Sequence, residues 1–354
     1  MSLGKLCIDL SNYELGKEIG KGTFGTVYKS KDLRTGEDVA IKVINQILVT
    51  KKDQEVFLRE IVIPGRIKSS GIVNMIGFRF PISGDEKKDE KGINNAVIVT
   101  EYIPNGSLKE INAKYLSSSD VLPNFGPTER AIIIFGVAAI MMKAHEAKII
   151  HRDLTLGNVM LDENMFPKVG DFGCARFANN DTNKTLIVGT PISMAPEIME
   201  SEDYDQSIDV YSYGILLYLM FTNEIELDDG LPIRSTMNMM LRVQSGVRPK
   251  RPPNMPDFYW ELATSCWSHA PKDRPTFSQI VHKFLENDKM LLDEKGKKTD
   301  LLKLHHYQNM MMMDESSGSH SDPNPAKKFH DTTTKPLTHS GKAFRKQKFN
   351  WHRH

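Results

Sequence analysis

The chain has 354 residues, of which 40% are hydrophobic and 26% are charged, and its formal net charge is +1. This composition suits one large or two ordinary domains with a sizeable core, and the near-zero charge argues against nucleic-acid binding through global charge. Three widely spaced cysteines without a C-x-x-C pair argue against a disulfide framework or a zinc site and predict a reducing compartment. The first residues lack the apolar run of a signal peptide, and no apolar stretch is long enough to span a bilayer. We therefore expect a soluble, cytoplasmic protein with no membrane span.

The order of the predicted elements indicates the fold class. Residues 13–102 alternate apolar and polar positions and are rich in β-branched residues, which predicts strands. A helical stretch at about 53–63 interrupts them, and Pro64 predicts that it ends near Ile63, because proline has no amide to bond to the preceding turn. From about residue 127 the pattern becomes helical. Strands first and helices afterwards predict two segregated lobes rather than an alternating parallel sheet.

The composition changes near the end of the chain. Residues 287–354 hold thirteen Lys and Arg against eight Asp and Glu, together with serine, proline and methionine runs. This biased, polar make-up predicts a disordered basic tail. The tail could be a solvated extension without a function or a segment that binds a partner.

Five short motifs carry the chemical information. In chain order they are G-K-G-T-F-G (20–25), V-A-I-K (39–42), H-R-D-L (151–154) with Asn158, D-F-G (171–173) and A-P-E (195–197). Each is common by itself: the glycine run could be a plain hairpin turn, and a strand lysine usually reaches for solvent. Their occurrence in this order within one chain is very unlikely to be chance.

This set of motifs resembles eukaryotic protein kinases from about Tyr13 to Leu285. The resemblance implies the two-lobed α+β protein kinase fold, with a small β-rich N-lobe that carries one main helix and a larger helical C-lobe. The implied kinase domain covers 13–286, with the N-lobe at about 13–101, the hinge at about 102–106 and the C-lobe at about 107–286. The basic tail lies outside the resemblance.

The resemblance also implies roles in moving the γ-phosphate of ATP. Lys42 would contact the α- and β-phosphates, with Glu60 of the N-lobe helix as its partner. Asp171 and Asn158 would hold Mg²⁺, with Mn²⁺ as a possible substitute, because hard cations prefer oxygen ligands. Asp153 would orient the hydroxyl of the substrate.

The same resemblance implies a nucleotide pocket. Thr100 would be the gatekeeper, and the carbonyl of Glu101 and the amide of Ile103 would bond the edge of adenine. The full set of implied nucleotide-binding residues is Gly20, Lys21, Gly22, Gly25, Val27, Ala40, Lys42, Thr100, Glu101, Ile103 and Met160. The apolar members could equally be ordinary core residues.

The subclass signals are mixed. The strings EYIPNGSL, DVYSYGILLY and CWSHAPKDRPTF resemble the tyrosine-kinase and tyrosine-kinase-like branches, whereas Gly189-Thr190-Pro191 resembles serine/threonine kinases. We therefore expect a tyrosine-kinase-like serine/threonine kinase that acts on protein substrates. A pseudokinase that only binds nucleotide or a partner, and a tyrosine or dual-specificity kinase, are the alternatives.

Other positions resemble regulatory and structural features of the family. Arg152 before Asp153 resembles kinases that an upstream kinase activates, here on Thr185 or Thr182. One position departs from the pattern, since Thr155 stands where serine/threonine kinases usually have a lysine that contacts the γ-phosphate. Asp209 resembles a buried aspartate of the C-lobe, and Glu197 with Arg274 resembles a buried ion pair. His151 and Phe172 resemble members of a stacked apolar spine.

Overall fold

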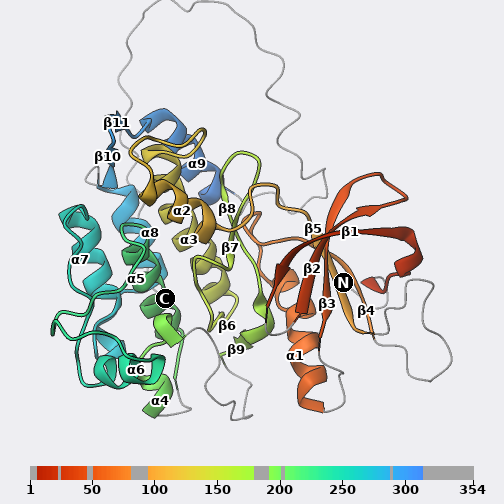
Figure 1. Ribbon diagram of the computed structural model, residues 1–354, viewed down its shortest axis with the longest axis horizontal. Coiled ribbons are helices and arrows are strands. Elements are labelled where there is room, and N and C mark those ends of the chain that lie inside the picture. The colour runs from red at the N-terminus through yellow and green to blue at the C-terminus, as the bar shows by residue number, and fades with distance from the viewer. Residues whose placement is uncertain are drawn as a thin grey trace, which may run out of the picture. The chain divides into compact units, whose positions relative to one another are not determined.

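The computed structural model describes residues 6–22, 25–45, 51–80, 95–178, 191–200, 204–287 and 290–313. All of them belong to one compact unit, which covers Met1–Ser316. Its N-terminal part is a five-stranded antiparallel sheet in the order β1-β2-β3-β5-β4. The strands are β1 (Tyr13–Lys21), β2 (Gly25–Asp32), β3 (Asp38–Ile44), β4 (Met75–Arg79) and β5 (Val97–Glu101), and Figure 1 shows them side by side. The expected α+β arrangement of a β-rich N-lobe and a helical C-lobe is confirmed.

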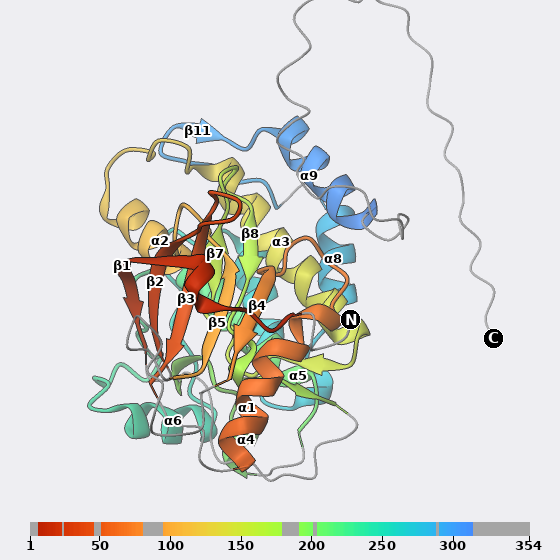
Figure 2. The ribbon, with the colours of Figure 1, turned by 90° about the vertical axis from the view of Figure 1, so that its right-hand side faces the viewer.

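Helix α1 (Lys51–Val62) packs on the sheet through Phe57 and Ile61, which are buried against Phe78 and Ile98. Figure 2 shows α1 beside the lower end of the sheet, below β4. The helix stops at Val62, and a short 3₁₀ turn, η3 (Pro64–Arg66), follows with its own bonding pattern. The predicted end near Ile63 is confirmed, because Pro64 cannot donate the amide that another α-helical turn needs.

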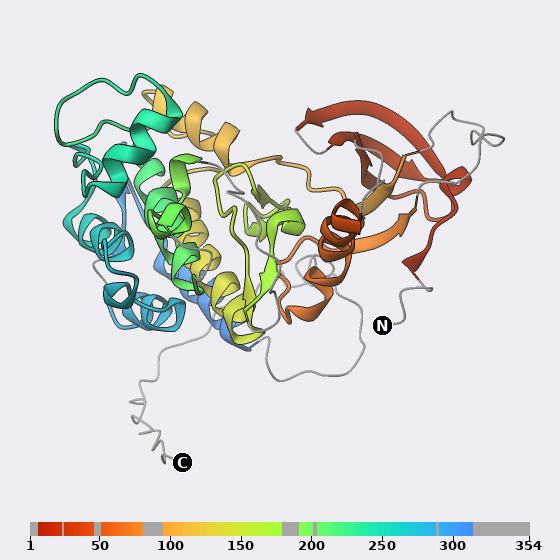
Figure 3. The ribbon, with the colours of Figure 1, turned by 90° about the horizontal axis from the view of Figure 1, so that it is seen from below.

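The C-terminal part is built around α3 (Pro127–Glu146), which is buried along almost its whole length. Its apolar residues are buried all round, as expected for a helix at the centre of a core. Figure 3 shows helices gathered around it and the sheet at the other side. The remaining helices of this part are α2 (Leu108–Ser117), α4 (Glu197–Glu200), α5 (Ser207–Leu219), α6 (Thr236–Gln244), α7 (Asp257–Cys266) and α8 (Phe277–Leu285).

Short strand pairs hold the loops that face the N-lobe. Strand β6 (Ile149–Ile150) pairs with β9 (Arg176–Phe177), and β7 (Val159–Leu161) pairs with β8 (Pro167–Val169). The D-F-G motif follows β8 and forms the turn η4 (Phe172–Cys174), while η2 (Leu10–Asn12), η5 (Pro191–Ser193) and η6 (Pro271–Asp273) are further short turns. The two hairpins therefore fix the segments that carry the H-R-D-L and D-F-G motifs.

The expectation of a tail disordered from residue 287 is wrong for residues 290–313. They form β10 (Asp293–Glu294), β11 (Lys297–Lys298) and α9 (Leu301–Met313), and α9 packs on α3. Leu304, Tyr307 and Met311 recur at helical spacing and are buried against the core. A composition average over 287–354 hides this stripe, because charged and polar residues surround it. Residues 314–354 lie outside the described residues. Within the described chain, no helix is long and apolar enough to cross a membrane.

Candidate active site

Three predicted residues meet at the side of the sheet that faces the C-lobe. The Lys42 Nζ atom on β3 lies 2.5 Å from a carboxylate oxygen of Glu60 on α1 and 3.5 Å from one of Asp171. Burial alone would lower the pKa of Lys42, but the charges of Glu60 and Asp171 outweigh it and raise that pKa to about 12. The ammonium group is therefore held charged and aimed by two carboxylates.

Local sequence explains why Lys42 and Glu60 face each other. Val39 and Ile41 on β3 are buried in one cluster, so the strand alternation directs Lys42 to the opposite face. On α1, Phe57 and Ile61 anchor the helix to the sheet, and Glu60 precedes Ile61 on the last regular turn. The pair is formed although the helix ends at Val62, two residues before Pro64.

The segment with the H-R-D-L motif is held by a buried carboxylate. Asp209 on α5 accepts hydrogen bonds from the backbone amides of His151 and Arg152, at 2.8 Å each, and lies 3.0 Å from His145 Nε2. Burial would raise the pKa of Asp209, but the hydrogen bond and charge of His145, aided by the His151 amide, hold it below the usual value. Arg152 has a left-handed backbone, with φ of 66°, which these bonds stabilise.

Asp153 and Asn158 lie together at the end of this loop. The Asn158 side-chain amide donates to the backbone carbonyl of Asp153 at 2.7 Å and to its carboxylate at 2.9 Å. These two bonds occupy the NH₂ group of the Asn158 side chain. Its side-chain oxygen is thereby left as a hard ligand for a cation. The backbone carbonyl of Asn158 also accepts a hydrogen bond from the backbone amide of Gly170. This bond links the loop to the residue before Asp171.

The D-F-G segment stacks beneath the N-lobe helix. The rings of Phe172 and His151 are 4.8 Å apart, and His151 Nε2 lies 3.1 Å from the carbonyl of Gly170. Asp171 has φ of 55°, and its side chain accepts from the Gly173 amide. Burial raises the pKa of the neighbouring Cys174 thiol to about 12, so it is a packing residue rather than a nucleophile.

The predicted nucleotide-binding residues line up across the strands. Val27 on β2 is paired with Lys42 on β3, and Ala40 is paired with Thr100 on β5. Met160 on β7 is bridged to Ser107 just after the hinge. The first glycine of the motif, Gly20, is the last residue but one of β1, and a Cβ at Gly25 would come 2.7 Å from the carbonyl oxygen of Val43. Thr23 and Phe24, at the tip of the motif, lie outside the described residues.

A polar contact behind the hinge was not predicted. The Glu101 carboxylate accepts from Lys168 Nζ and from the backbone amide of Asn74, at 2.7 Å each. Lys168 lies on β8 and Asn74 precedes β4, so this one side chain, at the end of β5 just before the hinge, joins the two lobes. In the sequence analysis, only the backbone carbonyl of Glu101 was expected to have a role, at the edge of adenine. Lys168 gives no motif signal, because its partner is 67 residues away.

The end of the segment that follows D-F-G is anchored as expected. Arg274 binds the Glu197 carboxylate through two nitrogens, at 2.5 and 2.8 Å. A second anchor was not predicted: Tyr204 accepts a hydrogen bond from Arg152 at 3.1 Å, and its ring packs under Arg176. Thr182, Thr185, Gly189 and Thr190 lie outside the described residues.

Comparison with known proteins is consistent with this geometry. Residues 13–285 match the family described as protein kinase domain. The chain is 34% identical over 274 residues to the RGS domain-containing serine/threonine-protein kinase A of Dictyostelium discoideum, covering 77% of this chain and 22% of that protein. It is 31% identical over 287 residues to the serine/threonine-protein kinase STY46 of Arabidopsis thaliana (81% and 46%). It is 28% identical over 297 residues to the dual specificity protein kinase shkB of D. discoideum (81% and 42%). The chain thus spans less than half the length of these relatives.

Proposed function

The chain belongs to the protein kinase family, and from that membership we propose that it transfers the γ-phosphate of ATP to serine or threonine hydroxyls of protein substrates. The observation that carries the proposal is the formed Lys42–Glu60 pair beside Asp171. A pseudokinase is less compatible with this arrangement, because the lysine, both candidate metal ligands and Asp153 are all present.

The residues fit a nucleotide with a divalent cation. Lys42 supplies a fixed positive charge for phosphate oxygens, and the absence of a Cβ at Gly25 lets the backbone pass close to Val43. Asp171 and the Asn158 amide oxygen are the hard ligands that would hold Mg²⁺ or Mn²⁺. ATP would supply the transferable phosphoryl group, and the cation would offset its charge.

Asp153 is the residue we assign to the substrate hydroxyl. Its carboxylate is oriented by Asn158, so it can accept the hydroxyl hydrogen while that oxygen is held in line for transfer. The Asp209 bonds to His151 and Arg152 position this loop. The chemistry needed from the protein is therefore orientation and charge rather than covalent catalysis.

The preference for serine and threonine rests on the names of two of the relatives described above and on the Gly189-Thr190-Pro191 string. Activation by a separate kinase that modifies Thr185 or Thr182 is part of the same proposal. A phosphate there could pair with Arg152, which already bonds to Tyr204. Normal activation of a chain with both Thr182→Ala and Thr185→Ala would contradict that part.

The test is a transfer assay with labelled ATP, followed by phosphoamino-acid analysis of the products. We expect phosphoserine and phosphothreonine from the native chain. Lys42→Met and Asp171→Asn should each lower kcat/KM by at least about 10², as expected for loss of a main electrostatic group. Circular dichroism of both variants should match that of the native chain.

The matched control is Lys298→Met on β11, because Lys298 forms an exposed ion pair with Asp293 and lies on the C-lobe hairpin rather than on the sheet that carries Lys42. Its activity should stay within about twofold of the native value, as expected for an exposed ion pair. Near-native activity of Asp171→Asn would overturn the enzyme proposal. Phosphotyrosine as the sole product would overturn the serine/threonine assignment.

A further inference from the structure

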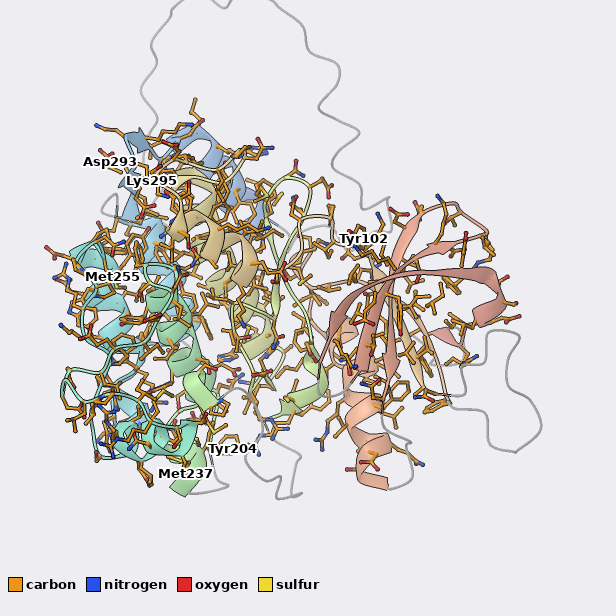
Figure 4. All side chains as sticks on the ribbon, in the orientation of Figure 1. Tyr102, Tyr204, Met237, Met255, Asp293 and Lys295 are labelled. Carbon is orange, nitrogen blue, oxygen red and sulfur yellow. The ribbon has the colours of Figure 1, made fainter. Side chains whose placement is uncertain are left out.

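The segment that follows the matched kinase domain is unused by the proposed chemistry. Residues 290–313, which we call the α9 strap, lie beyond the residues that match the family. Lys295, labelled in Figure 4, donates from its Nζ atom to the backbone carbonyl of Ser118, the residue after α2, at 2.7 Å. The Asp300 amide donates to the hydroxyl of Thr128, in the first turn of α3, at 2.9 Å. The strap is therefore fixed at α2 and α3 before α9 begins.

Tyr307 on α9 brings the strap into contact with the hairpin of β7 and β8. Its side chain is 1% exposed, and its ring lies 4.6 Å from the ring of Phe166, the residue before β8. Gly136 on α3 leaves room for this contact. A Cβ at Gly136 would come 2.3 Å from the Tyr307 hydroxyl and 2.6 Å from Pro167, the first residue of β8. The tyrosine, the glycine and the proline thus pack α9, α3 and β8 against one another at close range.

The ring of Tyr307, rather than its hydroxyl, makes this contact. The hydroxyl is buried and has no hydrogen-bond partner within the part of the chain that the structure describes. A buried polar group without a partner lowers stability, so the hydroxyl contributes bulk here and no bond. Phenylalanine would keep the ring contact with Phe166 and remove the unpartnered group. Tyr307→Phe is therefore a conservative variant for a test.

The hairpin that the strap contacts forms the predicted floor of the nucleotide site. In the register of the two strands, Leu161 is paired with Pro167, and Met160 is paired with Lys168. Met160 is one of the predicted nucleotide-binding residues. Lys168 binds the Glu101 carboxylate just before the hinge. The strap contact at Pro167 therefore lies one residue pair away from the predicted floor.

The same hairpin is bonded to the hinge itself. The Leu161 amide donates to the backbone carbonyl of Gly106 at 2.9 Å, and the Asn105 side chain donates to the backbone carbonyl of Asp162 at 2.6 Å. The Asn105 amide also donates to the carbonyl of Leu161, at 3.3 Å. Because of these bonds, a shift of the hairpin would move the hinge backbone, where the edge of adenine is expected to bind.

We propose that Tyr307 is a positioning residue for the nucleotide, through which the α9 strap sets the β7–β8 hairpin and the hinge at the spacing that adenine requires. This role rests on the proposed function. Asp209 on α5 holds the H-R-D-L segment through bonds that do not involve the strap. Loss of the Tyr307 contact should therefore weaken binding of the nucleotide in the ground state and the transition state alike, which changes KM rather than kcat.

The first test is steady-state kinetics of the full chain with Tyr307→Ala or Tyr307→Phe and a serine acceptor peptide chosen from an arrayed library. For Tyr307→Ala we expect the KM for ATP to rise about tenfold, while kcat and the KM for the peptide stay within about twofold. The Kd of ADP with Mg²⁺, measured by calorimetry, should rise by the same factor. Tyr307→Phe should match the native chain in all of these quantities.

The matched control is Phe284→Ala on α8. Phe284 is buried, and its ring lies 6.2 Å from the ring of Phe135, the α3 residue that the Tyr307 ring approaches at 6.3 Å. Both alanine variants remove a buried ring beside α3, so both should lower the free energy of unfolding. A loss of stability alone reduces the fraction of active protein and hence the apparent kcat, without a change in KM. Only Tyr307→Ala should therefore raise the KM for ATP.

Hydrogen exchange of the nucleotide-free chain tests the same link without any reaction. In Tyr307→Ala, the backbone amides of residues 159–169 and 101–106 should exchange faster than in the native chain, because local packing limits their opening. Phe284→Ala should leave the exchange of these two ranges unchanged relative to the rest of the chain. Tyr307→Phe should show native exchange.

A native KM for ATP together with native hydrogen exchange in Tyr307→Ala would overturn the positioning role. So would equal shifts in Phe284→Ala, since any cavity beside α3 would then have the same effect. If the native chain transfers no phosphate but Tyr307→Ala still weakens ADP binding, the proposed function fails and the positioning role stands. If transfer is normal in the native chain and Tyr307→Ala changes only kcat, the proposed function stands and the positioning role fails.

Discussion

At the residue scale, Thr155 is the departure with the clearest consequence. It lies two residues after Asp153, and its carbonyl accepts from the amide of Asn158 at 3.1 Å, so its backbone helps to hold the loop. Its neutral side chain stands where related serine/threonine kinases carry a lysine for the γ-phosphate. The absence of this lysine charge should slow phosphate transfer by a factor of about 10 to 10³, by analogy with the loss of a single stabilising hydrogen-bond donor.

We therefore expect Thr155→Lys to raise kcat while the KM for ATP stays similar, because the new contact acts mainly on the transition state. Steady-state kinetics at saturating ATP and peptide measure this. Thr155→Val is the control, since it removes the hydroxyl without adding charge. If Thr155→Lys is neutral or harmful and Thr155→Val is slow, the hydroxyl positions Asp153 and the missing-cation argument is wrong.

At the element scale, a carboxylate on β10 pairs with a buried arginine on α3. Arg130 on α3 is fully buried, and its guanidinium lies 3.0 Å from the Glu294 carboxylate and between the rings of Tyr115 and Phe221. Glu294 also accepts from the Tyr115 hydroxyl at 3.0 Å. The short hairpin thus neutralises a charge inside the helical core.

Glu294→Gln should lower the free energy of unfolding by about 3 kcal/mol, because breaking a buried pair leaves an uncompensated charge. Urea denaturation measures the change. The control is the adjacent Asp293→Asn, whose exposed carboxylate lies 3.9 Å from Lys298 and should contribute under about 0.5 kcal/mol. Figure 4 labels Asp293 and Lys295 on this hairpin. Equal effects of the two substitutions would mean that Arg130 does not depend on Glu294.

At the scale of the whole molecule, Asp209 joins the helical core to the site. It lies on α5, bonds to His145 at the end of α3 and holds the amides of His151 and Arg152. Its pKa is lowered in the folded state, so its contribution to stability is present above its unfolded pKa, near 3.9, and is lost as the pH falls through the folded value.

Asp209→Asn should therefore destabilise the protein at pH 7 by about 3 kcal/mol and weaken the loss of stability below about pH 4. Thermal unfolding between pH 3 and 8 measures both effects. Asp205→Asn is the control, since Asp205 is exposed and its side chain accepts from the Ser207 amide. An unchanged pH profile in Asp209→Asn would mean that other carboxylates control acid stability.

Much of the fold and the site could be read from the sequence, because the relevant signals are local. Strand alternation places Lys42 opposite Val39 and Ile41, and helical spacing places Glu60 beside Phe57. Pro64 ends α1 through its own missing amide, without reference to any distant residue. The catalytic motifs are short strings whose members are neighbours in the chain.

The tertiary structure decided what depends on partners far apart in the chain. Residues 290–313 pack on α3, where Tyr307 fills the space beside Gly136 and a Cβ would come 2.3 Å from the tyrosine hydroxyl. The bond between Lys168 and Glu101 likewise exists only when β8 and the hinge are side by side. The contact between Lys168 and Glu101 leaves no trace in the local sequence pattern, because charge pairing is a property of surfaces that meet only after folding.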